Sequence, residues 1–238
     1  MAATLRVATV PALGAFPGLV HGFEQRLGPS GWEERDAGRA RVALSLAPQG
    51  RLYLLKQVHG TVVRRAPWEG RPEGDAAVAD GAGMILGIET ADCLPVLLAD
   101  PRRRVAAAAH AGWRGTAAGV TGAAVAALVA GGSRPEDLVA ALGPGIGACC
   151  YEVGEELRAA FGPGGDAFFR PGPRGKPHLD VRAANVAQLV AAGVPASRIH
   201  SVADCTQCRA DLYHSYRRDG PRSGRMINYI GWEAPPGA

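Results

Sequence analysis

The sequence predicts an α/β (α+β) fold, a mixed-sheet sandwich organised as a single domain over residues 1–238. Several runs of strand length are apolar throughout, which is typical of strands that are buried on both faces. Alanine-rich segments of helical length alternate with these runs, so we expect helices to cover the sheet. The order of the elements is too irregular for a simple doubly wound repeat, and no internal repeat or low-complexity linker divides the chain.

The first half of the chain is expected to contain one helix and four strands. Residues 33–47 form the helix, with Ala40, Leu44 and Ala47 on one face. The strands are expected at residues 52–58, 84–90, 94–99 and 105–109. The last of these runs contains no polar side chain, and His110 follows at its end.

The second half of the chain is expected to be richer in helices. Thr116 and Asp180 are suitable N-caps for two of them, and a glycine-rich loop at residues 143–147 precedes a third. The helices are expected over residues 117–130, 152–161 and 181–192. The strands are expected over residues 138–142, 199–202 and 226–230.

The composition is that of a globular protein, because 47% of the residues are hydrophobic and the net charge is only +4, which excludes intrinsic disorder. Lys56 and Lys176 are the only lysines among 26 basic residues, so the remaining 24 are arginines. These arginines are scattered, and the longest basic run, residues 102–104, is expected to be a solvated turn. We therefore expect no nucleic-acid partner.

The sequence also predicts a cytoplasmic protein without a membrane anchor. Arg6, Pro11 and Pro17 interrupt the N-terminal apolar stretch, unlike a signal peptide. Residues 115–133 carry no charge and approach membrane-spanning length, but they are mostly alanine and are expected to form a buried core helix. Five cysteines without an export signal favour reduced thiols in a cytoplasm.

Three polar residues follow apolar elements and are candidates for one site. His59 follows a predicted strand, Cys93 lies between two of them, and His110 ends another. Two imidazoles and a thiolate are suitable zinc ligands and leave a fourth position for water, whose pKa zinc would lower towards about 7. The separations of 34 and 17 residues form no local metal motif. Two hydrogen-bonded structural histidines and an inert thiol therefore remain an open alternative, as does a Cys93 nucleophile activated by His110.

A second metal site is an alternative further along the chain. His200, Cys205, Cys208 and His214 give two cysteines and two histidines at short separations, which could close a structural zinc site. A surface turn with two reduced thiols explains the same pattern. The adjacent pair Cys149–Cys150 is interpreted as packing, without chemistry.

Two glycine-containing segments are candidates for anion binding. Residues 110–116 read as a strand end, a tight turn and a helix start, where backbone N–H groups bind anions and Arg114 would add a charge. Residues 143–147 could act in the same way, although a tight chain reversal is the favoured interpretation of this loop.

Several long segments resemble the YfiH-like family, whose members have been labelled laccase-domain proteins, multicopper polyphenol oxidoreductases and purine nucleoside phosphorylases. The matching segments are HGFEQRLG (21–28), KQVHG (56–60), TADCLPVLLAD (90–100), HAGWRGTAAGV (110–120), LGPGIGACCYEVG (142–154) and DCTQCRADLYHSYRRDGPRSGRM (204–226). The resemblance implies that His59, Cys93 and His110 bind a catalytic zinc. It assigns no metal to Cys205 and Cys208.

The resemblance also implies an activity, namely phosphorolysis of adenosine, inosine, guanosine or methylthioadenosine to a base and ribose 1-phosphate, with deamination of adenosine at the same metal. We expect Arg26 and Arg114 to hold phosphate, and Asp92 to orient a ligand or act as a base. The expected protein is a monomer or homodimer.

Three other functions remain open. Copper bound at the same residues would give a polyphenol oxidase, although six histidines are too few for a multicopper oxidase. Cys93 and His110 could instead form a cysteine hydrolase. Cys205 and Cys208 could stabilise a non-enzymatic zinc-binding module.

Overall fold

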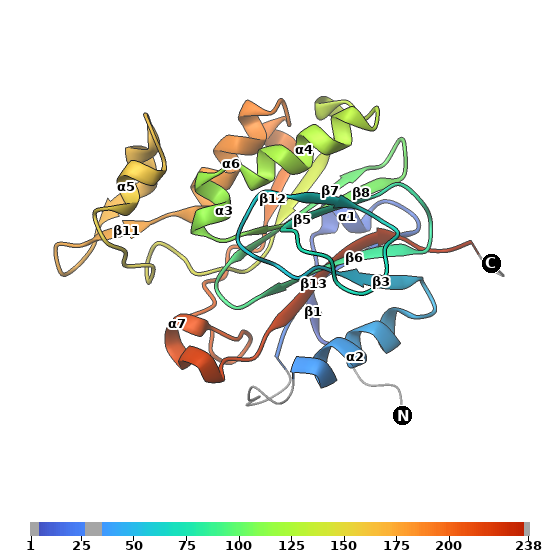
Figure 1. Ribbon diagram of the computed structural model, residues 1–238, viewed down its shortest axis with the longest axis horizontal. Helices are drawn as coiled ribbons and strands as arrows, with labels where there is room; N and C mark the ends of the chain where they lie inside the picture. Colours follow the sequence, from blue (N-terminus) through green and yellow to red (C-terminus); the bar gives the residue numbers. More distant parts are fainter. Residues whose placement is uncertain (1–4, 27–34, 236–238) are drawn as a thin grey trace.

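The computed structural model describes residues 5–26 and 35–235. Two β-sheets lie face to face, with helices on the outer face of each (Figure 1). The mixed-sheet sandwich predicted from the sequence is therefore confirmed, and the structure divides its strands between two sheets.

The smaller sheet has five strands and is mixed. In spatial order these are β1 (Val7–Ala8), β2 (Leu19–Glu24), β13 (Met226–Trp232), β6 (Met84–Thr90) and β3 (Arg51–Leu54). β3 pairs with β6 in parallel, and the other pairs are antiparallel. Helix α2 (Arg35–Leu46) covers the outer face, where Val42 and Leu46 are buried with Ile85 and Ile227.

The larger sheet has six strands. In spatial order these are β12 (Ile199–Ser201), β9 (Val139–Leu142), β7 (Leu94–Asp100), β8 (Val105–Ala111), β5 (Ala76–Ala79) and β4 (Val63–Arg65). Helices α4 (Val120–Ala130) and α6 (Val181–Ala191) pack on its outer face. In β7, Leu97 packs between the sheets, whereas Val96 and Leu98 pack towards the helices. The four central strands β9, β7, β8 and β5 are buried on both faces, which explains their almost entirely apolar sequences.

The remaining elements are short. The helices are α1 (Pro11–Gly14), α3 (Trp113–Ala117), α5 (Leu157–Ala160) and α7 (Tyr216–Asp219), and β10 (Phe169–Pro171) pairs with β11 (Pro177–Leu179). Single 3₁₀ turns occur at Pro135–Asp137, Gly165–Phe168, Ala196–Arg198 and Gly220–Arg222. Among the described residues, no helix is long and apolar enough to cross a membrane.

Three predicted elements require correction. The strand expected at residues 52–58 ends at Leu54, and its remainder becomes a connection that carries His59. The helix expected over residues 117–130 is interrupted at Gly119, whose φ of +88° lies in the left-handed region. Thr116 is therefore not its cap but a residue of α3, where its hydroxyl accepts a hydrogen bond from Asn185.

The helix expected over residues 152–161 shrinks to α5, because Glu152 instead forms a β-bridge with His178. Other predictions are confirmed more closely. β6 has the expected bounds, and the Asp180 carboxylate caps α6 by accepting from the Ala183 N–H at 2.9 Å. The first residues of the helix predicted at 33–47 lie outside the described part of the chain.

Candidate active site

Two of the connections between the sheets carry residues of the candidate site. The chain passes from β3 in the smaller sheet to β4 in the larger one, and His59 lies in that connection. It passes again from β6 to β7, where Cys93 lies. His110 lies within β8, one residue before its end, rather than beyond the strand as the sequence suggested. Its even-numbered neighbours Ala106 and Ala108 pack between the sheets, so the alternation of β8 turns His110 towards the same space.

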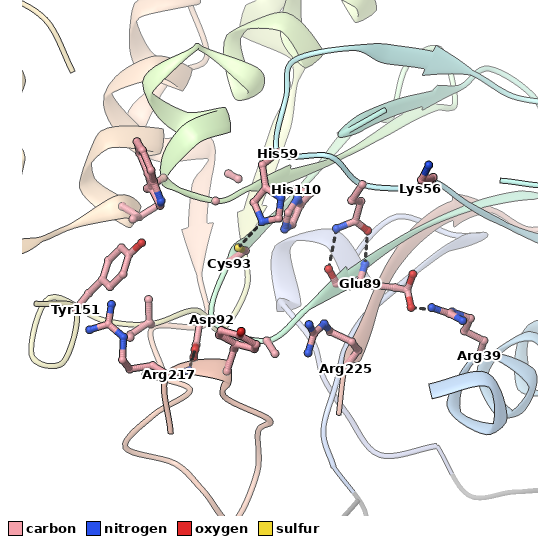
Figure 2. Close-up of a pocket in the computed structure, with 18 of the residues that line it drawn as sticks. Arg39, Lys56, His59, Glu89, Asp92, Cys93, His110, Tyr151, Arg217 and Arg225 are labelled. Atoms are coloured by element: carbon pink, nitrogen blue, oxygen red, sulfur yellow. Dashed lines mark hydrogen bonds and ion pairs between the residues drawn. The ribbon is translucent and has the colours of Figure 1, made fainter. Parts of the chain in front are cut away.

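His59, Cys93 and His110 converge, as expected, although 51 residues separate the first from the last. Their ligand atoms all lie within 4.8 Å of one another. The Cys93 Sγ is 3.8 Å from the His59 Nε2, a contact drawn as a dashed line in Figure 2. The two imidazole rings meet edge to face with centroids 4.8 Å apart.

Asp75, which the sequence analysis missed, fixes both histidines. Its fully buried carboxylate bonds the His110 Nδ1 at 2.9 Å and accepts from the His59 backbone N–H at 2.8 Å. It also accepts from the N–H groups of Val58 and Gly60. Because Asp75 occupies the Nδ1 of His110, the Nε2 is left to face His59 and Cys93.

The backbone is distorted on both sides of this cluster. His59 and Asp92 have φ values of +64° and +90°, which non-glycine residues rarely adopt and which occur mainly at functional sites. Gly112 is equally constrained, because a Cβ atom there would lie 2.9 Å from the Cys93 Sγ and 3.0 Å from the His59 ring. Only glycine therefore lets the cluster close against β8.

The electrostatics favour a thiolate in the metal-free protein. Burial alone would raise the pKa of Cys93, but the charge of His110 and the hydrogen bonds from both histidines lower it to about 6. Burial would likewise lower the pKa of His110, yet Cys93 and Asp75 raise it to about 9. At neutral pH these two groups form a thiolate–imidazolium pair. A thiolate is the form of cysteine that binds metals.

The donor set fits a catalytic metal. Two imidazoles and one thiolate supply three protein ligands, and a carboxylate behind one imidazole is the usual support for such a ligand. All three residues line a cavity of about 620 Å³, so a fourth coordination position would face the cavity.

The cavity walls combine aromatic and cationic side chains. Trp113, Tyr151 and Tyr216 supply aromatic surface. Burial raises the pKa of Tyr151 to about 12, so its hydroxyl remains protonated at neutral pH. The cationic residues are Arg39, Lys56, Arg71, Arg217 and Arg225.

Most of these cations already pair with carboxylates. Glu89 forms ion pairs with Arg39 and Arg71, and Lys56 pairs with Glu73 at 2.9 Å. Gln57 holds the Glu89 backbone in place with two 2.8 Å hydrogen bonds.

Arg217 and Arg225 differ, because the hydrogen bonds of their guanidinium groups within the described residues go to backbone carbonyls. Arg217 donates to Glu152 O at 2.9 Å, and Arg225 to Gly224 O at 2.8 Å. In Figure 2 both side chains extend from the wall opposite His59. Their charges are thus available to an anion in the cavity.

Asp92 lines the cavity, but both of its carboxylate oxygens are already bonded. One accepts from the Thr206 hydroxyl and the other from the Arg217 N–H, each at 2.6 Å. Asp92 therefore ties the connection between β6 and β7 to the segment that leads into α7.

The two arginines predicted to bind phosphate do not line the cavity. Arg114 is exposed and stacks on the Trp113 ring at 4.5 Å. Arg26 donates to Ala210 O at 3.1 Å. The loop at residues 143–147 uses its amides internally, as a tight chain reversal would, since Gly143 donates to Pro95 O and Ile146 to Asp92 O.

A second group of ligating side chains lies outside the cavity. Cys149, Cys150, Cys205 and Cys208 place their sulfur atoms within 4.8 Å of one another. The predicted partners His200 and His214 do not belong to it. His214 is instead buried, with a pKa lowered to about 4 mainly by that burial, and His200 lies in β12. Cys149 and Cys150, interpreted as packing residues, replace the two histidines.

Comparisons with known proteins agree with this architecture. The family described as multi-copper polyphenol oxidoreductase laccase matches residues 33–233. The chain is 44% identical to a purine nucleoside phosphorylase of Deinococcus radiodurans, over 81% of this chain and 75% of that protein. It is 41% identical to adenosine deaminase RL5 of an unknown prokaryotic organism, over 66% of this chain and 61% of that protein.

A solved structure shows the same fold over nearly the whole chain. YlmD from Geobacillus stearothermophilus superposes with a TM-score of 0.83 and 28% identity, covering 98% of each chain. The strands that place His59, Cys93 and His110 thus belong to a fold already seen in crystals.

Proposed function

We propose that this chain, which belongs to the family described as multi-copper polyphenol oxidoreductase laccase, is a metal-dependent enzyme that processes purine nucleosides. Its main reaction is phosphorolysis of adenosine, inosine, guanosine or methylthioadenosine, and deamination of adenosine takes place at the same site. The names of two similar proteins, a purine nucleoside phosphorylase and an adenosine deaminase, support both activities. Residues 1–238 act as one catalytic domain in the cytoplasm.

One observation carries the proposal: His59, Cys93 and His110 converge on the wall of a cavity large enough for a nucleoside. Zinc is the metal that this donor set fits best. When bound, zinc supplies a Lewis acid and lowers the pKa of water. Copper would also bind nitrogen and sulfur donors, but six histidines are too few for a multicopper oxidase.

The aromatic walls bind the base. A purine ring presents a flat π face, which Trp113, Tyr151 and Tyr216 can contact from the cavity wall. The Tyr151 hydroxyl stays protonated at neutral pH and can donate a hydrogen bond to a ring nitrogen. These residues orient the nucleoside with one end towards the histidines.

Arg217 and Arg225 bind phosphate. In phosphorolysis an oxygen of hydrogen phosphate forms a bond to C1′ of ribose, the bond from C1′ to the base breaks, and the proton given up by hydrogen phosphate ends on the leaving base. A dianion next to an uncharged nucleoside requires cations that are not already neutralised, and Arg217 and Arg225 meet that requirement.

The test is product analysis with adenosine. Zinc-loaded protein is incubated with and without inorganic phosphate, and the bases and nucleosides are separated by chromatography. Adenine that forms only with phosphate and disappears in Cys93→Ala supports phosphorolysis at this site. Inosine in both buffers supports deamination. If neither product forms at any zinc loading, the proposal is wrong.

Each alternative function predicts a different experimental result. A Cys93 hydrolase would survive removal of metal and lose activity on thiol alkylation. A zinc-stabilised binding module would unfold when metal is removed and turn over no nucleoside. A copper oxidase would consume oxygen with a phenol, independent of phosphate.

A further inference from the structure

We propose that Cys149, Cys150, Cys205 and Cys208 form a second metal site, a mononuclear tetrathiolate site that takes Zn²⁺. The sulfur atoms come from two segments that are more than 50 residues apart in sequence. This site is separate from His59, Cys93 and His110 and does not depend on the proposed enzyme activity.

The distances between the sulfur atoms fit a single ion. With zinc–sulfur bonds of about 2.3 Å, a tetrahedron of four sulfurs has edges of about 3.8 Å. Cys208 Sγ lies 3.8 Å from the Cys149 sulfur and 3.3 Å from that of Cys150, and all four sulfurs lie within 4.8 Å. An iron–sulfur cluster needs room for several iron and sulfide atoms between its ligands, which this spacing does not provide.

The backbone around Cys205 is arranged as in a metal-binding turn. The Gly147 N–H donates to the Cys205 Sγ at 3.2 Å, and the backbone of Cys208 also hydrogen-bonds this sulfur. The Arg209 N–H closes the turn onto Cys205 O at 3.0 Å. N–H groups directed at sulfur favour the thiolate, which is the form that coordinates zinc.

A guanidinium group lies beside the site, whose four thiolates with one zinc ion would carry two negative charges. Arg182 donates to Gly143 O at 2.9 Å. Burial lowers the pKa of Arg182, and the charges of Asp180, Asp204 and Cys205 partly oppose that shift, so the guanidinium lies within electrostatic range of the cluster.

The ion would join two segments that carry cavity residues. Tyr151 follows the Cys149–Cys150 pair, and Arg217 follows Cys208 by nine residues. The two segments already meet through the 3.1 Å hydrogen bond from the Thr206 N–H to Gly145 O. Zinc binding would release the thiol protons to solvent and lock this contact, so that the Tyr151 and Arg217 side of the cavity stays in place. Cys149 and Cys208 are exposed, so the ion can enter from solvent.

Zinc counting with matched cysteine variants tests the proposal. Full-length protein is prepared with zinc and without chelator, and zinc per chain is measured by plasma mass spectrometry. Cys208→Ser removes an exposed ligand of the proposed site, and Cys93→Ser is the matched control because Cys93 is the only cysteine outside the four. Cys93→Ser should retain about one zinc ion per chain, held by the four cysteines, and Cys93→Ser/Cys208→Ser should retain none.

Cobalt adds a readout that does not depend on activity. Cobalt-loaded Cys93→Ser should show the intense sulfur-to-cobalt charge-transfer and tetrahedral d–d bands of a thiolate-rich site, and Cys208→Ser should weaken them. The proposal is overturned if Cys93→Ser binds no zinc or if the bands are unchanged in the double variant. It is also overturned if denatured wild-type protein shows a disulfide between Cys150 and Cys208 in place of five reduced thiols. None of these results depends on nucleoside turnover.

Discussion

The two ligating clusters differ in what lies around their donor atoms. His59, Cys93 and His110 offer three mixed donors on the wall of a cavity, and the buried carboxylate of Asp75 stands behind them. The four cysteines offer four identical donors outside the cavity, with backbone N–H groups directed at Cys205. Three ligands with an open position are typical of catalytic zinc, and four cysteines are typical of structural zinc. The two sets of donors therefore suit different roles, chemistry at the cavity for the first and stability of the cavity wall for the second.

Loss of Cys93 should give the largest effect on activity. Cys93→Ala removes a proposed metal ligand. Nucleoside turnover should therefore fall by more than about 100-fold, which is the upper end of the loss seen when a residue hydrogen-bonded to a metal ligand is replaced. Thermal stability should change little, because the four-cysteine cluster is untouched. Steady-state kinetics and thermal unfolding of the same sample measure both. Turnover within about tenfold of wild type would contradict the assignment.

Thiol reactivity should distinguish Cys93 from Cys149 in metal-free protein. The pKa of Cys93 is lowered to about 6, so its thiolate forms as the pH rises through 6 and its alkylation rate then levels off. The pKa of Cys149 is raised to about 11 by partial desolvation of its sulfur and by hydrogen bonds with the Cys205 and Cys208 thiols, so it stays protonated at neutral pH although the residue is exposed. At pH 7 Cys93 should react on the order of 100-fold faster, since the difference in thiolate fraction outweighs the lower nucleophilicity. Mass spectrometry of iodoacetamide-treated protein measures this ratio, and equal rates would refute it.

Asp75→Asn should weaken metal binding by His59, Cys93 and His110. The amide keeps the size of the carboxylate but loses its charge towards His110, so zinc affinity and turnover should fall by about 10–100-fold. Zinc titration with a competing chelator measures the affinity. Full affinity in the variant would show that the bond from Asp75 to His110 has no such role.

The same variant should also be less stable, with a defined pH dependence. Burial would raise the pKa of Asp75, but the His110 bond and the backbone N–H groups lower it below its ordinary value. The stabilisation by this carboxylate is therefore present above about pH 4 and is lost as the pH falls through the native pKa. The difference in Tm between wild type and Asp75→Asn should shrink on acidification.

Removing a positive charge from the cavity wall should have a smaller effect on the reaction. Arg225→Gln removes a guanidinium group that faces the cavity, and the KM for phosphate should rise about tenfold because a hydrogen bond to a charged group is lost. Arg114→Gln is the matched control, since Arg114 is exposed and outside the cavity lining, and should change the KM by about twofold at most. Equal effects of the two substitutions would favour the sequence-based choice of Arg114.

The sequence was informative where chemistry coincides with the ends of apolar runs. His59, Cys93 and His110 stand at the ends of apolar runs in the sequence, and that pattern made them candidates for one site. Asp75 gave no comparable signal, because its role depends on a contact with His110 across 35 residues. Arg225 likewise reaches the cavity only through the tertiary arrangement.

The fold was predictable in its class but not in its division into two sheets. Strand bounds such as those of β6 follow from a run of mostly apolar residues. The break at Gly119 does not, because a glycine within a helical pattern is often tolerated. Of the four-cysteine cluster, the sequence indicated only Cys205 and Cys208 as possible metal ligands. Its other half, Cys149–Cys150, is brought close only when Gly145 pairs with Cys205 between the two segments.

Adenine formation by Cys93→Ser and Cys208→Ser, assayed side by side in phosphate with adenosine, tests the division of roles most directly. We expect no adenine above background with Cys93→Ser. Cys208→Ser should retain kcat within about tenfold of wild type, with any loss expressed mainly in KM, because Cys208 lies behind the cavity wall and not at the reacting atoms. Adenine formation at the wild-type rate by Cys93→Ser would contradict this division of roles, as would complete loss of turnover in Cys208→Ser alone.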